Sequence, residues 1–401
     1  MDLLDDARAL QPDLARVREA LHREPEVGLH LPRTQERVLD ELRGLPLEIS
    51  TGTGTTSVTA VLRGTGSEPA PGGRTTVLLR GDMDALPVEE RSGEEFAATN
   101  GAMHACGHDL HTAGLIGAAR LLSAHRDRLA GDVVFMFQPG EEGYDGARVM
   151  IEEGVLDAAG RRPDHAYALH VVPHRLPAGL ISGRAGVTLF ASYTLEVTVR
   201  GTGGHGATPY EARDPIVAAA EMVGALQTAV TRSFNVFSPV IVTVGVLRAG
   251  TTANIIPDTA SFEATVRAVD PDAGPELREV FGRYLRGIAA AHGVEVDVTL
   301  TAGYPATVND AAEAEYVGGV ARELFGEEHY HAAEHPSQGS EDFSRVLQEV
   351  PGVLLFLGAH VPGVEPGKAP ANHSPLARFD SSVLGRASAL LAGLAAERLC
   401  A

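Results

Sequence analysis

The sequence predicts a two-domain α/β protein in which a smaller, ferredoxin-like domain is inserted into a larger one. Short apolar strands alternate with helical stretches over residues 75–170, a different order of elements begins near Phe190, and the alternating pattern returns from about residue 311. A chain of 401 residues is also too long for one ordinary core. We expect the larger domain at residues 1–186 and 302–401 and the inserted domain at residues 187–301.

The first part of the chain predicts a mainly parallel sheet. Three apolar runs are strand candidates, and an Ala-rich helix over residues 109–129 lies between the first two. These runs are residues 76–80, 132–138 and 166–171. The Pro- and Gly-rich run over residues 64–73 is interpreted as a surface loop.

The N-terminal stretch predicts a surface helix. It is charged, it lacks the apolar core of a signal peptide, and its apolar residues recur at helical spacing. These apolar residues are Leu3, Leu10, Leu14, Val17 and Leu21.

The middle of the chain predicts the inserted domain through its order of elements. A strand, a helix, two strands, a helix and a strand follow one another, which is the βαββαβ order of the split-βαβ, ferredoxin-like unit. In this order the elements are residues 192–200, 214–232, 240–247, 260–269, 271–292 and 294–300. A helix over residues 311–325 and a strand over residues 353–357 return to the larger domain.

Composition excludes several classes of partner. The formal net charge is −20, and no basic patch occurs along the chain, so nucleic acid is not expected to bind. No apolar stretch approaches the length of a membrane span. Cys106 and Cys400 are the two cysteines, too few for a disulfide framework, which favours a reducing, cytoplasmic location.

The most informative motif is the run His104-Ala-Cys106-Gly-His108-Asp109, just before the predicted helix. A thiolate and an imidazole two residues apart can bind a soft or borderline divalent metal, and a helix N-terminus lowers the pKa of a thiol. A buried structural cysteine beside solvated histidines is the alternative interpretation.

Polar residues also follow the predicted strands. The run Phe137-Gln-Pro-Gly-Glu141-Glu142 puts two adjacent carboxylates directly after a strand, and open α/β sheets bind ligands at the carboxyl ends of their strands. Asp82-Met-Asp84 and His170 lie at two further strand ends, and His373 lies in a later loop. Each motif alone is compatible with a solvated turn, but four such positions together favour a site.

Taken in order, the motifs resemble the M20 metallopeptidases, specifically the amidohydrolase branch with hippurate hydrolases, N-acyl-amino-acid amidohydrolases and plant auxin-conjugate hydrolases. The matching runs span nearly the whole chain. They are RGDMDALP (80–87), HACGHD (104–109), FQPGEEG (137–143), ALHVVP (168–173), GTGGHGATP (201–209), TTANIIPD (251–258), GSEDFS (339–344) and ANHSP (371–375). The resemblance implies an M20-type fold, with a zinc-peptidase-like sheet in the catalytic domain and an inserted dimerisation or lid domain.

The resemblance also implies a site with two divalent metal ions in each subunit. Cys106 would bridge both metals, His108 and His170 would complete one, and Glu142 and His373 the other. Sulfur and imidazole suit Zn, Co or Ni, whereas a carboxylate-rich site suits Mn. This chain has Cys106 where most of the superfamily has a bridging carboxylate, which leaves the identity of the metal open. From the branch that the sequence resembles, we expect Zn or Mn, with Co or Ni as alternatives.

Catalytic and substrate-binding roles follow from the same resemblance. Glu141 would be the general base, and His205 of the inserted domain would donate a hydrogen bond to the oxyanion in the partner subunit's site. Asp84 would orient a ligand, with a structural role in its turn as the alternative. Asn254 would bind substrate, or else form an ordinary turn before Pro257. The acidic pair in the run at residues 339–343 is expected to be structural or to support the ligands.

The predicted reaction is hydrolysis of the amide bond of a small N-acylated amino acid by a homodimer or a dimer-based tetramer. Substrate choice depends on a pocket lining that the motifs do not specify, so two alternatives on the same fold remain: a dipeptidase or carboxypeptidase, and an N-acetyl-diaminopimelate deacetylase. A non-catalytic metal- or peptide-binding protein is disfavoured because the base Glu141 is present together with the ligands.

Overall fold

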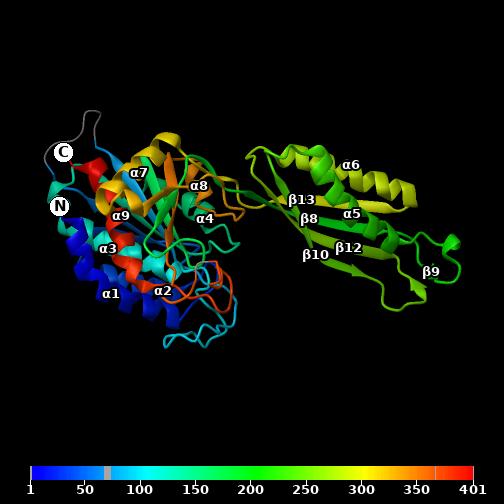
Figure 1. Ribbon diagram of the computed structural model, residues 1–401, viewed down its shortest axis with the longest axis horizontal. Coiled ribbons are helices and arrows are strands. Elements are labelled where there is room, and N and C mark those ends of the chain that lie inside the picture. Colours follow the sequence, from blue (N-terminus) through cyan, green and yellow to red (C-terminus); the bar gives the residue numbers. More distant parts are fainter. Residues whose placement is uncertain (1, 67–73, 366, 401) are drawn as a thin grey trace. The chain divides into compact units, whose positions relative to one another are not determined.

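The computed structural model describes residues 2–66, 74–365 and 367–400, which form two compact units (Figure 1). Unit 1 comprises Met1–Thr188, Val308–His335 and Asp342–Ala401, and unit 2 comprises Leu189–Thr307 and Pro336–Glu341. Of the predicted loop at residues 64–73, residues 67–73 lie outside the described residues.

The described residues of unit 1 form an eight-stranded mixed sheet in the order β1-β2-β4-β3-β5-β16-β6-β15. Strand β3 runs parallel to β4 and β5, and β16 runs parallel to β5, so the predicted parallel core of the sheet is confirmed. The strands are β1 (Leu47–Thr51), β2 (Val58–Arg63), β3 (Thr76–Asp82), β4 (Asp132–Gln138), β5 (His165–Val172), β6 (Ile181–Gly183), β15 (Tyr330–Ala332) and β16 (Gly352–Gly358).

The central strands are buried along their whole length. Every residue of β3 and of β4 is buried, which is why their sequences are continuous apolar runs rather than alternating ones. Asp82 ends β3 and Gln138 ends β4. The change from apolar to polar residues therefore marks the carboxyl edge of the sheet.

Helices cover this sheet. Helices α3 and α9 pack against β3 and β5, and α1 packs against both helices. Helix α3 ends at Ala124, earlier than predicted, because a 3-10 turn (Arg126–Arg128) follows. The helices of unit 1 are α1 (Leu3–Arg23), α2 (Pro32–Leu42), α3 (His108–Ala124), α4 (Gly146–Glu152), α7 (Ala311–Phe325), α8 (Ser344–Leu347) and α9 (Leu384–Leu399).

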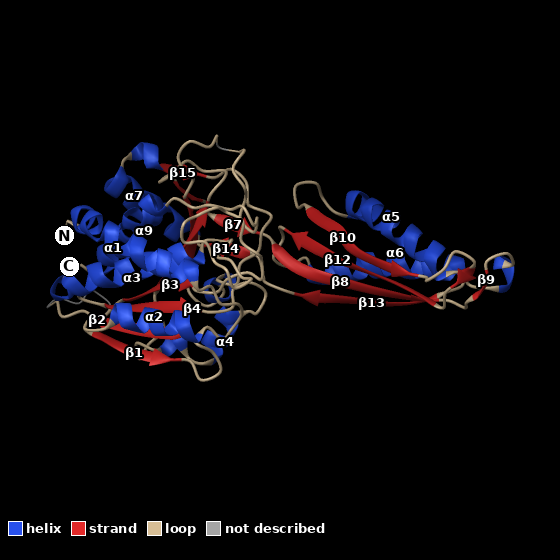
Figure 2. Ribbon diagram, turned by 90° about the horizontal axis from the view of Figure 1, so that it is seen from below, coloured by secondary structure: helices blue, strands red, loops and turns tan. Residues whose placement is uncertain are grey.

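Unit 2 has the predicted ferredoxin-like topology. Its main sheet is fully antiparallel in the order β10-β12-β8-β13, and helices α5 and α6 pack together on it (Figure 2). The elements are β8 (Ala191–Arg200), α5 (Pro215–Ser233), β10 (Val240–Ala249), β12 (Thr259–Ala268), α6 (Gly274–His292) and β13 (Glu295–Ala302). The chain enters through β7 (Gly186–Leu189) and leaves through β14 (Thr307–Asn309). Among the described residues, no helix is long and apolar enough to cross a membrane.

Candidate metal centre and active site

The predicted ligands of unit 1 gather at the carboxyl edge of β3, β4 and β5. His108 is the first residue of α3, Glu142 lies in the turn after β4, and His170 lies near the end of β5. Because these strands are parallel, residues that are far apart in sequence meet at one edge of the sheet. His373, from the loop before α9, joins them there.

Two groups of three potential ligands share Cys106. The first contains Cys106, His108 and His170, the second contains Cys106, Glu142 and His373, and within each group the ligand atoms all lie within 4.8 Å of one another. Cys106 Sγ lies 3.5 Å from His170 Nε2, and His373 Nε2 lies 3.2 Å from Glu142 Oε1. The sulfur of Cys106 therefore belongs to both sets of donors.

The orientation of the two buried imidazoles fits metal binding. His108 Nδ1 donates to the Asp84 carbonyl at 2.9 Å, and His170 Nδ1 donates to the Val171 carbonyl at 2.9 Å. In the neutral form of each ring, Nε2 is therefore the acceptor that faces the cluster. His108 Nε2 is buried and has no hydrogen-bond partner within the part of the chain that the structure describes, so a cation at this position would satisfy it.

His111 lies in the same region but has a structural role. Its Nδ1 donates to Asp82 Oδ1 at 2.6 Å, and its Nε2 accepts the Val171 N–H group at 2.8 Å. Both ring nitrogens are thus engaged. His111 joins β3 to β5 directly behind the candidate ligands.

Gly107 shapes the turn between Cys106 and His108. Its φ is +86°, and a Cβ atom there would lie 2.4 Å from Val171 Cγ2. A side chain is therefore excluded both by backbone conformation and by space. The sequence Cys-Gly-His allows the thiol and the first imidazole of α3 to point at one place.

Asp84 fixes the positions of both glutamates. Its Oδ1 accepts the backbone N–H group of Glu141 and its Oδ2 that of Glu142, each at 3.0 Å. Asp84 is 1% exposed, and Glu141 is also buried. The Asp84 carboxylate thus holds the turn in which Glu142 faces the ligand cluster and Glu141 lies beside it.

A buried network supports the strand ends behind this turn. Gln138 Nε2 donates to both carboxylate oxygens of Asp342 at 2.8 Å, and Arg80 Nη2 donates to Asp342 Oδ1 at 3.1 Å. Arg80 also pairs with Asp82 at 2.6 Å. Asp342, from the predicted acidic pair, therefore ties β3 to β4.

Burial and charge set the ionisation of two site residues. Burial lowers the pKa of His170 well below its usual value, which keeps the ring neutral, the form that binds metals. Burial alone would raise the pKa of Asp82, but the charge of Arg80 and the neighbouring histidines hold it well below its usual range.

A second buried network anchors the first turn of α3. Arg18 Nε and His22 Nδ1, both on α1, contact Asp109 Oδ2 at 2.6 and 2.8 Å. Asp109 directly follows His108, so α1 fixes the start of the helix that carries a candidate ligand. Sequence reasoning missed this network because nothing in the pattern of α1 connects it to a residue about 90 positions away.

Asn372 is a further residue that sequence reasoning missed. Its Nδ2 donates to the Cys106 carbonyl at 3.1 Å and the Val171 carbonyl at 3.2 Å, and it lies 3.7 Å from Cys106 Sγ. In the sequence, the signal for Asn372 was its position directly before His373. His373 itself has a φ of +69°, and its backbone N–H donates to the Ala105 carbonyl at 2.9 Å.

His205 and Asn254 lie next to each other in unit 2. His205 is in β9 (Gly204–His205), which pairs with β11 (Ile255–Ile256), and the Gly206 N–H donates to the Asn254 carbonyl at 2.9 Å. Both residues are exposed. They lie beyond Arg200, the last residue of β8. The chain enters unit 2 at the opposite end of this strand, which is roughly 30 Å away because β8 has ten residues.

The ring of His205 has a defined tautomer. Its Nδ1 accepts the Ala207 N–H group at 3.0 Å, so in the neutral ring the proton is on Nε2. The exposed side chain therefore offers one N–H donor.

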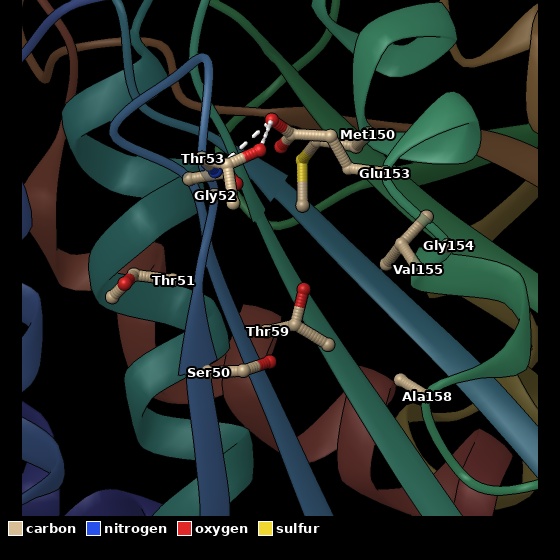
Figure 3. A pocket seen from close by; sticks show the side chains of 11 residues that line it. Ser50, Thr51, Gly52, Thr53, Thr59, Met150, Glu153, Gly154, Val155 and Ala158 are labelled. Atoms are coloured by element: carbon tan, nitrogen blue, oxygen red, sulfur yellow. Dashed lines mark hydrogen bonds between the residues drawn. The ribbon is translucent and has the colours of Figure 1, made fainter.

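A separate pocket of about 300 Å³ lies between the β1–β2 hairpin and the end of α4 (Figure 3). Five of its eleven lining residues carry hydroxyl groups, and Glu153 accepts the backbone N–H groups of Thr53 and Gly54 at 3.0 and 2.6 Å. None of the candidate ligands lines it. The lining residues are Ser50, Thr51, Gly52, Thr53, Ser57, Thr59, Met150, Glu153, Gly154, Val155 and Ala158.

A thiolate, imidazoles and carboxylates at the carboxyl edge of an α/β sheet define a class of metal-dependent proteins whose donor set suits two metal ions. The chain belongs to peptidase family M20/M25/M40, whose model matches residues 78–397. The resemblance seen in its motifs is thereby confirmed.

Three similar proteins illustrate this membership. The chain is 34% identical over 393 residues to thermostable carboxypeptidase 1 of Saccharolobus solfataricus, covering 96% of each chain. It is 33% identical over 390 residues to N-acetylcysteine deacetylase of Bacillus subtilis, covering 97% of each. The crystal structure of the Bacillus subtilis YxeP protein, a dinuclear metal-binding peptidase from the M20 family, matches with a TM-score of 0.82 and 30% identity over 98% of this chain and 99% of that one.

Proposed function

We propose that the protein is a metal-dependent amidohydrolase that hydrolyses the amide bond of small N-acylated amino acids. The observation that carries this proposal is the pair of ligand groups sharing Cys106, with Glu141 held directly beside Glu142. The similarity to a deacetylase of an N-acetyl amino acid supports the substrate class.

Two divalent metal ions would be held by Cys106, His108, Glu142, His170 and His373. Bound there, they would polarise the scissile carbonyl and lower the pKa of a water molecule. The buried His108 Nε2, which has no hydrogen-bond partner among the described residues, supports this assignment. Zn or Mn is the metal that we propose, with Co or Ni as alternatives. The sulfur and imidazole donors suit Zn, Co or Ni, and the carboxylate of Glu142 suits Mn.

Glu141 is the proposed general base. It would take the proton from the attacking water and pass it to the leaving amine, which requires a carboxylate that is close to the ligands but is not one of them. Asp84 supports this division, because its two oxygens hold the backbone of Glu141 and Glu142 separately. Asp84 is thus proposed as a positioning residue.

His205 is the proposed donor to the oxyanion. The proton on its Nε2 and its exposure support a role toward a ligand, since an oxyanion needs a donor that is already in place. Its position at the end of unit 2 opposite to the chain entry supports action on the partner subunit of a homodimer or dimer-based tetramer. Asn254, which lies beside it, would contact the same substrate.

The second candidate function is a carboxypeptidase or dipeptidase, favoured by the similarity to thermostable carboxypeptidase 1. N-acetyl-diaminopimelate deacetylation remains a third alternative. The test is a panel of N-acetyl, N-benzoyl and indole-acetyl amino acids beside dipeptides, assayed with Zn, Mn, Co and Ni for release of free amino acid. Faster cleavage of dipeptides than of every acyl amino acid would reject the proposed substrate class.

Both cysteines are free thiols, which supports a proposed cytoplasmic location.

A further inference from the structure

The side chain of Asn372 joins the three segments that carry most of the candidate ligands. Its Nδ2 contacts the carbonyl and the Sγ of Cys106 as well as the carbonyl of Val171, which follows His170 on β5. Asn372 itself precedes His373 in the loop before α9. One amide group therefore connects the cysteine loop, the end of β5 and the last loop.

The three contacts determine which way this amide points. Carbonyl oxygens are acceptors, so the group that faces the carbonyls of Cys106 and Val171 must be the NH₂ group rather than Oδ1. The Val171 carbonyl also accepts from His170 Nδ1 at 2.9 Å, so the same oxygen orients a ligand ring and holds Asn372. The amide is partly buried, which limits competition from water.

We propose that Asn372 is a positioning residue for the bridging thiolate: its amide donates an N–H···S hydrogen bond that orients Cys106 and sets its strength as a metal donor. The inference rests on the proposed function, because it takes Cys106 as the ligand shared by the two ions. The hydrogen bond withdraws electron density from sulfur, as hydrogen bonds to metal-bound sulfur do in other sites.

This arrangement has a further consequence. The same amide also fixes the loop that carries His373 relative to Cys106, although Asn372 and Cys106 are 266 positions apart in the sequence. Loss of the donor is expected to weaken metal binding by about 10- to 100-fold.

The experiment compares the wild-type protein with Asn372→Leu, which keeps the size of the side chain and removes the donor. Both proteins are loaded with two equivalents of Co²⁺, and the sulfur-to-cobalt charge-transfer band is recorded in the near ultraviolet. Without the N–H group the sulfur electrons lie higher in energy, so the band of the variant is expected at longer wavelength. A merely structural role would change the amount of bound cobalt but not the position of the band.

Ser374→Ala is the matched control in the same loop. Ser374 Oγ accepts the Leu376 N–H group at 3.2 Å, so this variant disturbs the turn without removing a contact with sulfur. Its band is expected at the wild-type position. An equal shift in the control, or an unshifted band in cobalt-loaded Asn372→Leu, overturns the proposal.

Asn372→Asp provides the same test if the leucine variant does not fold, because aspartate has the shape of asparagine and lacks the donor. Retention of the wild-type band by this variant likewise overturns the inference. Failure of the proposed function gives a different result: if Cys106 is not a ligand, the cobalt-loaded wild-type protein itself has no sulfur-to-cobalt band.

Discussion

Asp84→Asn tests whether one carboxylate sets the geometry of both glutamates. In the wild-type protein the two oxygens of Asp84 accept the N–H groups of Glu141 and Glu142 at 3.0 Å each. Asparagine has the same shape but one acceptor oxygen, so one of these N–H groups faces an NH₂ group. The backbone carbonyl of residue 84, which orients His108, is unchanged.

The expected loss follows from these two contacts. A hydrogen bond to a charged group contributes about 1.5–3 kcal/mol, and a buried donor left unpaired costs about 1–3 kcal/mol. We therefore expect a loss of about 3 kcal/mol. If the turn moves so that the N–H group no longer faces the NH₂ group, kcat/KM is expected to fall about 100-fold. If the turn keeps its position, the free energy of unfolding is expected to fall by about 3 kcal/mol instead.

The assay measures kcat/KM, urea unfolding and metal content of the purified variant. Glu153→Gln is the matched control, because Glu153 also accepts two backbone N–H groups, at Thr53 and Gly54, but lines the separate pocket. This control is expected to keep kcat/KM within twofold. Less than a threefold loss of kcat/KM in Asp84→Asn, together with unchanged stability, would refute the positioning role.

Three further predictions follow from the proposed roles. Glu141→Gln is expected to lower kcat by several orders of magnitude and to leave the metal content nearly unchanged, whereas Glu142→Gln is expected to lose metal; elemental analysis showing the reverse pattern would exchange the two assignments. Iodoacetamide is expected to modify Cys106 faster in the metal-free protein than in the metal-loaded protein, because a coordinated thiolate is a poorer nucleophile, and equal rates would speak against coordination. Half-buried Cys400, the internal control, is expected to react at one rate in both forms, a slow one because burial raises its pKa. Mixing His205→Ala with Glu141→Ala is expected to restore roughly a quarter of wild-type activity, since about half of the reassorted dimers are mixed and each of these has one intact site. Differently tagged chains verify the exchange, and mixed dimers without activity would exclude donation by the partner.

The strand-end motifs could be predicted from the sequence because two local patterns coincide there. A continuous apolar run identifies a strand buried on both faces, and the first polar residues after it mark the carboxyl edge of the sheet. This logic located Asp82, Glu141 and His170. Both patterns depend only on neighbouring residues and not on how distant segments pack. For this reason β4 was predicted with its observed bounds.

Other features depend on packing that leaves no periodic signal. Helix α9 is buried on nearly all sides, so its sequence has no polar face from which a helix could be recognised. Asn372 and His111 act through contacts with Val171, and an ordinary valine in a strand carries no sign that its backbone groups hold two other side chains. The proximity of His205 and Asn254 likewise arises from the pairing of β9 with β11.

The order of residues along the chain has a consequence for biosynthesis. The first ligand group, Cys106, His108 and His170, is contained in the first 170 residues, whereas the second needs His373, which follows all of unit 2. During translation, the three residues of the first group are therefore synthesised long before His373. Since N-terminal segments emerge first, the two candidate ligand groups are completed in a fixed order, and a chain that stops before His373 has at most the first of them.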